Sequence, residues 1–155
     1  MGNDWNNPPV VQWSQYLLDS YAHWLRHELI DRSGTAQEQA YRLFHSPFVV
    51  ASHSTEADPI LNYGNQAALV LWEMDWQQFT QTPSRLTAEP PNREERAHML
   101  EQAKTQGYIS DYRGIRISSS GKRFLVEQAI IWTIHKPGGA TIGQGATFSI
   151  WKFLE

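Results

Sequence analysis

The sequence predicts one α+β domain in which an antiparallel sheet carries helices on one face. Three strand-like segments close the chain, at residues 108–118, 123–134 and 142–151, and turn clusters rich in serine, glycine and proline separate them. Two short apolar β-type runs and several capped helical segments precede them. A chain of 155 residues has room for one domain with its own core. We therefore expect a β-meander covered by helices.

Composition argues against several classes of function. Thirteen basic residues against sixteen acidic ones give a net charge of −3, so no overall positive field attracts nucleic acid. There are no cysteines, which excludes disulfides, thiolate metal sites and a cysteine nucleophile. The chain also lacks an apolar run of about 18 residues and a signal-peptide pattern at its polar start. We expect a cytoplasmic protein that binds neither nucleic acid nor membrane.

The N-terminal region predicts an amphipathic helix over residues 10–30. Large apolar side chains recur there at every fourth position. They are Trp13, Leu17, Tyr21, Leu25 and Leu29. Thr35 and Glu38 then form a capping box for a second helix. We assign residues 1–46 to a helical extension and residues 47–155 to the main domain, and we expect the apolar stripe to mediate self-association or docking on a protein partner.

Cap signals define the helices of the main domain. A hairpin is expected from the β-type runs at 48–51 and 60–63, and Asn65 follows it as the cap of a short helix. Asp75 caps the next turn. Asn92 is expected to begin a helix that stops at Gly107 and whose thin apolar face covers the surface of the domain.

The middle strand of the meander alternates regularly between residues 123 and 134. Its even-numbered side chains share one face, which we expect to meet the helices. They are Phe124, Val126, Gln128, Ile130, Trp132 and Ile134. Gln128 is the polar interruption of that face, and it either makes a structural hydrogen bond or contacts a ligand.

Several blocks of the sequence, in order, resemble the MEKHLA domain family. They include Leu61-Asn62-Tyr63-Gly64-Asn65, Leu71-Trp72-Glu73, Pro83-Ser84-Arg85-Leu86-Thr87-Ala88-Glu89-Pro90, Gly114-Ile115-Arg116-Ile117-Ser118 and Ile142-Gly143-Gln144-Gly145-Ala146-Thr147-Phe148-Ser149. The resemblance runs from about residue 47 to 151 and implies a PAS-like fold with a sensory or regulatory role. The chain is similar to the free-standing bacterial members. It has no homeodomain or zipper heptads like those of the plant members, so DNA binding is not carried over.

A PAS-like fold implies a pocket between the sheet and the short helices. The ligand-binding candidates combine apolar wall with a few orienting polar groups. They are Tyr63, Asn65, Trp72, Arg85, Tyr112, Gln128, Trp132 and Gln144. Arg85 either clamps a carboxylate ligand or pairs with Glu89.

Two other functions compete with a sensory or regulatory module that binds a small molecule or a protein partner. One is a small α+β enzyme that uses His53 with Glu56 or Asp58 as acid–base groups, and the other is an interaction scaffold with a filled core. His23 and His27 lie four residues apart but lack a third ligand, so no metal site is expected. No haem or flavin anchor is evident, and the cofactor is left unknown.

Overall fold

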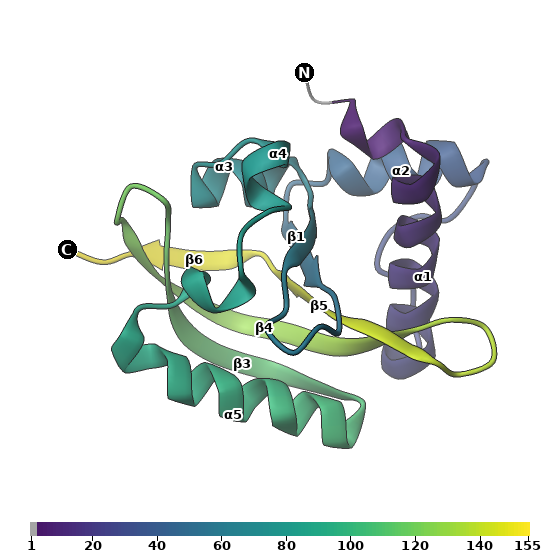
Figure 1. The fold of residues 1–155 in the computed structure, drawn as a ribbon. Helices are drawn as coiled ribbons and strands as arrows, with labels where there is room; N and C mark the ends of the chain where they lie inside the picture. The colour runs from purple at the N-terminus through teal and green to yellow at the C-terminus, as the bar shows by residue number, and fades with distance from the viewer. Residues whose placement is uncertain (1–2) are drawn as a thin grey trace.

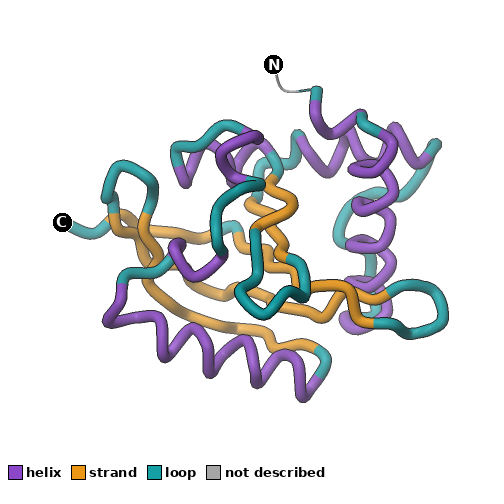
Figure 2. The backbone as a smooth tube through the Cα atoms, viewed as in Figure 1, coloured by secondary structure: helices purple, strands orange, loops and turns teal. Residues whose placement is uncertain are grey.

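The fold was obtained as a computed structural model, and residues 3–155 are described (Figure 1). A 3-10 helix and two α-helices come first, two strands and the remaining helices follow, and four strands close the chain (Figure 2). In chain order the elements are η1 (Asp4–Asn6), α1 (Pro8–Leu25), α2 (Ala36–Phe44), β1 (Val49–His53), β2 (Leu61–Gly64), α3 (Gln66–Trp72), α4 (Trp76–Phe79), η2 (Ser84–Thr87), α5 (Pro90–Gln106), β3 (Tyr108–Ile117), β4 (Arg123–His135), β5 (Thr141–Phe148) and β6 (Ile150–Phe153).

The sheet is antiparallel at every pairing, in the order β2-β1-β5-β4-β3. The third predicted strand breaks at Ser149 into β5 and β6, and β6 pairs with the first half of β4. The α3, α4 and α5 helices cover one side of the sheet, and α1 packs across β4 on the other side (Figure 1). The predicted α+β fold class and its N-terminal helices are confirmed.

The first helix buries its apolar stripe against the chain's own sheet. Leu17, Leu18 and Tyr21 are buried, and the Trp132 indole on β4 donates a hydrogen bond of 3.2 Å to the Leu17 carbonyl. Because the stripe lies inside the fold, it is not the free docking surface that the sequence suggested. The helix also ends earlier than predicted, at Leu25, where the next residue turns into a left-handed conformation.

Local cap signals correctly predicted most of the other helices. The capping box of Thr35 and Glu38 starts α2, and the Asn65 and Asp75 side chains cap α3 and α4. The prediction that Asn92 caps α5 was wrong. That helix begins at Pro90, because prolines fit its first turn without losing a hydrogen bond.

A β-bulge at Gln128 overturns the predicted inward face of β4. Gln128 has a φ of 55° and is exposed, and the pairing with β3 shifts around it. An extra residue in one strand switches the faces of the residues that follow. Trp132 therefore faces α1, while the side chains that face α5 and the short helices change from even to odd numbers. The latter are Phe124, Val126, Ala129 and Ile131.

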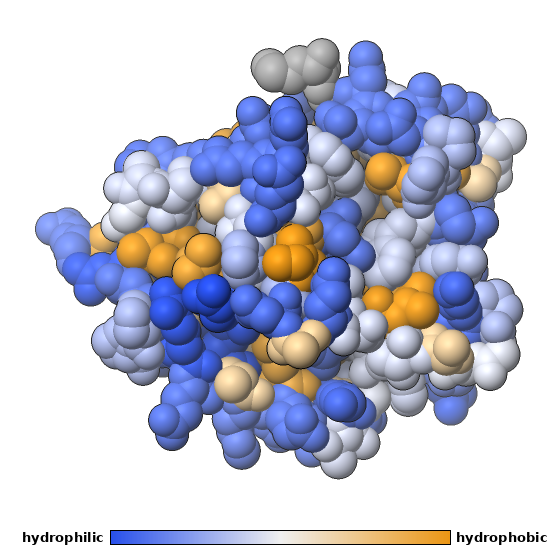
Figure 3. Space-filling model, viewed as in Figure 1, coloured by the Kyte–Doolittle hydropathy of each residue, from blue (hydrophilic) through white to orange (hydrophobic). Residues whose placement is uncertain are grey.

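Apolar side chains form a cluster on each face of the sheet, one under α3 and α5 and one under α1. The surface in Figure 3 is mostly hydrophilic, with separate small apolar patches. Among residues 3–155, no helix combines the length and the hydropathy needed to span a bilayer.

Candidate functional site

A cavity of about 80 Å³ lies inside the main domain, between the sheet and the helices α5 and η2. Small side chains on the sheet leave room for it, because Ala51, Ala129 and Ala146 face α5 from three neighbouring strands. Met99 and Leu100 close it from α5. The wall is predominantly apolar, as in most small-molecule sites.

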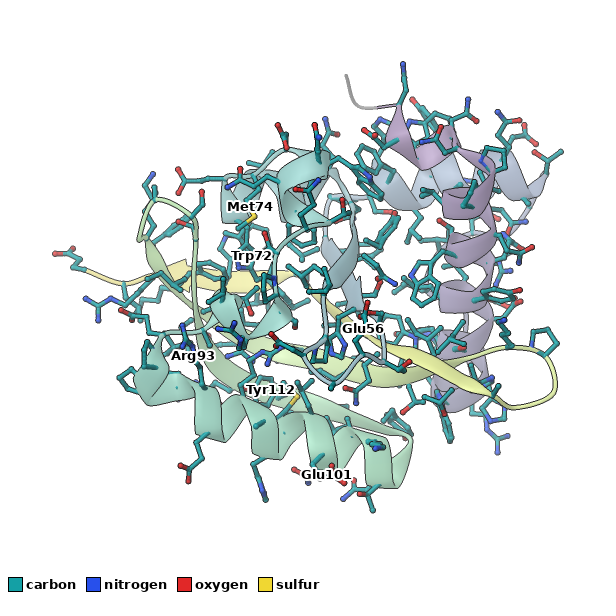
Figure 4. All side chains as sticks on the ribbon, viewed as in Figure 1. Glu56, Trp72, Met74, Arg93, Glu101 and Tyr112 are labelled. Carbon is teal, nitrogen blue, oxygen red and sulfur yellow. The ribbon has the colours of Figure 1, made fainter. Side chains whose placement is uncertain are left out.

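Trp72 forms one end of this pocket. It ends α3, and its ring packs edge-on against Phe124, Phe148 and Phe79, with 5.3 Å between the Trp72 and Phe124 ring centroids. Figure 4 shows the side chain below α3, directed toward the sheet. Its Nε1–H is buried and has no hydrogen-bond partner. An unpaired indole donor in a cavity can bind an acceptor on a ligand.

His53 supplies a second unpaired polar atom. Its Nδ1 lies 2.9 Å from the Ser54 carbonyl oxygen, which requires Nδ1 to donate, while the buried Nε2 has no partner. Burial lowers the pKa of the imidazole, although the Ser54 bond opposes this, and the Arg96 charge lowers it further. The ring is therefore neutral near pH 7, and Nε2 offers a lone pair to the pocket.

The acid–base arrangement proposed for His53 is not assembled. Glu56 and Asp58 are exposed on the loop after β1, and Asp58 pairs with Arg85 at 3.2 Å. A Glu56 carboxylate oxygen lies 3.4 Å from the backbone nitrogen of Ile60. Because neither acid is bonded to His53, no carboxylate orients the imidazole as a general base requires.

Arg96 is the most unusual residue of the site. It is 8% exposed, on the face of α5 that carries Met99, and Nη2 donates to Ser84 Oγ on η2. Burial, and then the nearby charge of Arg116, lower the pKa of the Arg96 guanidinium to about 10. The group remains charged near neutral pH, and it is desolvated while no carboxylate in the described part of the chain pairs with it.

Arg116 places a second buried guanidinium beside the first. This side chain on β3 is also 8% exposed; it donates to the Ile115 carbonyl and to Tyr112 Oη and lies 5.6 Å from the centroid of the Tyr112 ring. Tyr112 in turn donates to Glu95 at 2.7 Å. Burial raises the pKa of Tyr112, so its hydroxyl stays protonated. Figure 4 shows Tyr112 between α5 and the sheet.

Gln144 completes the polar lining from β5. Its amide donates to the Leu100 carbonyl at 2.9 Å and so ties the strand to α5. His53 pairs with Gln144 in the sheet, which puts both side chains on the same face. Of the predicted ligand-binding residues, the pocket thus contains Trp72, Tyr112 and Gln144.

The other five predicted residues lie outside the pocket. Tyr63 and Trp132 are buried in the cluster under α1, and Asn65 is a buried cap whose amide holds the chain before β1. Arg85 is half exposed and pairs with Asp58, and Glu89 pairs with Arg123, so the predicted pair between Arg85 and Glu89 is wrong. Gln128 points outward at the bulge.

Sequence reasoning missed Arg96 and Arg116. Arg96 stands in the charged run Arg93-Glu94-Glu95-Arg96, which is typical of a solvated first turn, yet it lies three residues before Met99 and seven before Ala103, which are buried. This helical spacing was the available signal. The buried residues Gly114 and Arg116 of β3, and Ser118 just after it, occupy every second position, so Arg116 lies on the inner face of the strand.

His23 and His27 make contacts with other aromatic rings. Within residues 3–155, no three His, Cys, Asp or Glu side chains gather in a way that could hold a metal ion. His23 packs against the ring of His135, with 5.1 Å between the ring centroids, and His27 packs against Tyr21.

Solved structures show that the chain has the fold of PAS domains and light-oxygen-voltage domains. A PAS domain from Colwellia psychrerythraea shares 13% identity with a TM-score of 0.64, over 74% of this chain and 95% of that one. A light-oxygen-voltage domain studied with a flavin analogue shares 11% identity with a TM-score of 0.59, over 76% and 85% of the two chains. An RNA-binding light-oxygen-voltage receptor matches with a TM-score of 0.64 and 13% identity, over 77% of this chain and 34% of the receptor.

Within that class, residues 11–153 match the MEKHLA domain, and the chain belongs to this family. The match begins in α1, so it includes both N-terminal helices as well as the sheet. No curated protein matches the sequence. At identities of 11–13% the solved structures establish the fold, and the chemistry of the site has to be argued from its own residues.

Proposed function

We propose that this chain is a sensory or regulatory module that binds a small molecule in the cavity between α5 and the sheet. The observation that carries the proposal is the pair of unpaired polar atoms, Trp72 Nε1 and His53 Nε2, in the wall of that cavity. A buried polar group without a partner costs about 1–3 kcal/mol, so two in one apolar cavity are expected where a ligand, or water bound with it, satisfies them.

The sheet offers a route by which a bound molecule could affect the rest of the chain. In β5, Gln144 and Ala146 face the cavity, while Gly143 and Gly145 lie against Trp13 and Trp132 on the α1 side. A ligand that shifts β5 would therefore change the packing of α1. This physical connection fits a sensory module better than it fits a static scaffold.

A blocked pocket tests the proposal. In Ala129→Leu, three added carbon atoms point into the cavity from a buried position on β4. We expect small organic compounds that raise the melting temperature of the wild type to leave that of Ala129→Leu unchanged. The outward-facing Gln128→Leu is the matched control, and it should respond like the wild type. Equal ligand responses in the wild type and the blocked variant would refute a ligand site in this cavity.

A further inference from the structure

We propose that the pocket binds a compact monocarboxylate, with the carboxylate on Arg96 and a short apolar tail against the alanine-lined sheet. This inference rests on the proposed function and names the chemical class of its ligand. It follows from a charge imbalance in the site, from the donors that remain free, and from the size of the cavity.

The cavity contains two buried positive charges that no acidic side chain of residues 3–155 balances. Arg96 and Arg116 are both 8% exposed and line the same cavity, and among residues 3–155 neither forms an ion pair with an acidic side chain. Buried charges in proteins are ordinarily paired. Glu95 is the acidic group connected to this region, but it bonds to the Tyr112 hydroxyl and is exposed. The site therefore carries excess positive charge that an anion would balance.

The free donors indicate where the anion binds. A guanidinium has five N–H donors. The Arg96 guanidinium donates from Nη2 to Ser84 and forms no other hydrogen bond to residues 3–155. Arg116 is already engaged by the Ile115 carbonyl and Tyr112. The planar fork of Arg96 matches the two oxygens of a carboxylate.

The size and polarity of the cavity restrict the rest of the ligand. At about 80 Å³ it takes a few heavy atoms, and the sheet contributes Ala51, Ala129, Ala146 and Ile131 to its wall. A phosphate would bring a second negative charge and further acceptor oxygens into a cavity whose wall is predominantly apolar. A ligand with one negative charge and a short apolar tail fits both the small volume and the apolar wall of the cavity.

Wild-type protein alone provides the first test. We would measure binding of sodium butyrate, butyramide and 1-butanol by isothermal titration calorimetry at pH 7. These probes share the tail and differ in the head group. We expect butyrate to bind about 10- to 100-fold more tightly than the amide or the alcohol, since each neutral head lacks the negative charge and the second acceptor oxygen that the guanidinium fork binds. Equal or tighter binding of the neutral probes would overturn the carboxylate and leave the pocket proposal standing.

Two arginine variants provide the second test. Arg96→Met keeps the aliphatic stem, and we expect it to weaken butyrate by about 10- to 100-fold while 1-butanol changes less than about threefold. Arg85→Met removes a half-exposed arginine outside the cavity and should bind butyrate like the wild type. Equal loss in both variants, or none in Arg96→Met, would refute the assignment. If no probe binds the wild type, the monocarboxylate proposal is refuted. The pocket itself is refuted separately, if other compounds raise the melting temperatures of Ala129→Leu and the wild type equally.

Discussion

Replacing Arg96 by methionine is expected to stabilise the ligand-free protein. The folded chain holds this guanidinium almost out of water, and no carboxylate among residues 3–155 pairs with it, so its pKa falls from the ordinary arginine range to about 10. At about 1.4 kcal/mol per unit, the fall corresponds to a cost on the order of 3 kcal/mol for keeping the group charged. Methionine removes that cost and retains most of the aliphatic stem. The loss of the hydrogen bond to Ser84 lowers stability by about 1 kcal/mol. We expect the free energy of unfolding to rise by about 1–3 kcal/mol.

Urea unfolding followed by tryptophan fluorescence measures this change, as a shift of the midpoint at constant slope. The gain should be the same from about pH 7.5 to 9. Arg96 is charged in the folded and the unfolded state over that range, and the cost disappears only as the pH rises through about 10 toward the ordinary pKa of an arginine. Arg85→Met should change stability by less than about 1 kcal/mol, because its ion pair is exposed. A loss of more than about 1 kcal/mol in Arg96→Met would show that the charge is compensated in the folded protein, and our reasoning would fail.

Further predictions concern the sheet, its caps and the pocket histidine. Gly145→Ala should lower stability by about 1–3 kcal/mol in the same urea assay, because the new Cβ would lie 2.8 Å from the Trp132 ring; an unchanged midpoint would contradict this packing. Asn65→Ala should cost about 3 kcal/mol or more, since the buried amide makes four hydrogen bonds to the backbone, and a loss under 1 kcal/mol would disagree. Gln128→Gly should be neutral or stabilising by up to about 1 kcal/mol, while Gln128→Val destabilises, because the φ of 55° suits glycine; the reverse order would argue against the bulge. Burial keeps the pKa of His53 low in the folded state, so stability should fall as the pH drops below about 6.5, where the unfolded histidine takes up a proton; His53→Gln should lose less stability over this range, and equal losses would place the ring in water.

Local signals in the sequence predicted the elements well. The capping box at Thr35, the cap at Asn65 and the stop at Gly107 each depend on residues within a few positions, so they can be interpreted without the fold. The resemblance of the quoted blocks to the MEKHLA domain supplied the arrangement of those elements, and the family is confirmed. The boundary between residues 46 and 47 stays a prediction.

The bulge on β4 accounts for two of the misplaced site residues. After residue 128 both faces of the strand are apolar, so the even-numbered alternation continues in the sequence while the side chains change sides. Gln128 and Trp132 were therefore assigned to the wrong face. A bulge depends on pairing between strands, which no pattern within one strand reveals.

The arginines were missed for a different reason. A charged residue is normally exposed, so the sequence favours a solvated position for Arg96, and its burial depends on η2 and β3 closing around α5. His53 was considered as a catalytic base because of its neighbours in the loop. The structure instead separates it from Glu56 and Asp58 and places it on the pocket wall.

The central claim is that a small molecule enters the cavity beside Trp72, and indole NMR tests it most directly. Each tryptophan gives one indole N–H signal, and Trp72→Phe would assign that of Trp72. The indole of Trp5, a residue of η1 that packs edge-on against Tyr41 with 5.1 Å between the ring centroids, is an internal control. We predict that sodium butyrate shifts the Trp72 signal in a saturable way, and that Arg96→Met removes this response. A Trp72 signal that stays fixed while butyrate is titrated, or one that moves equally in Ala129→Leu, would contradict the account.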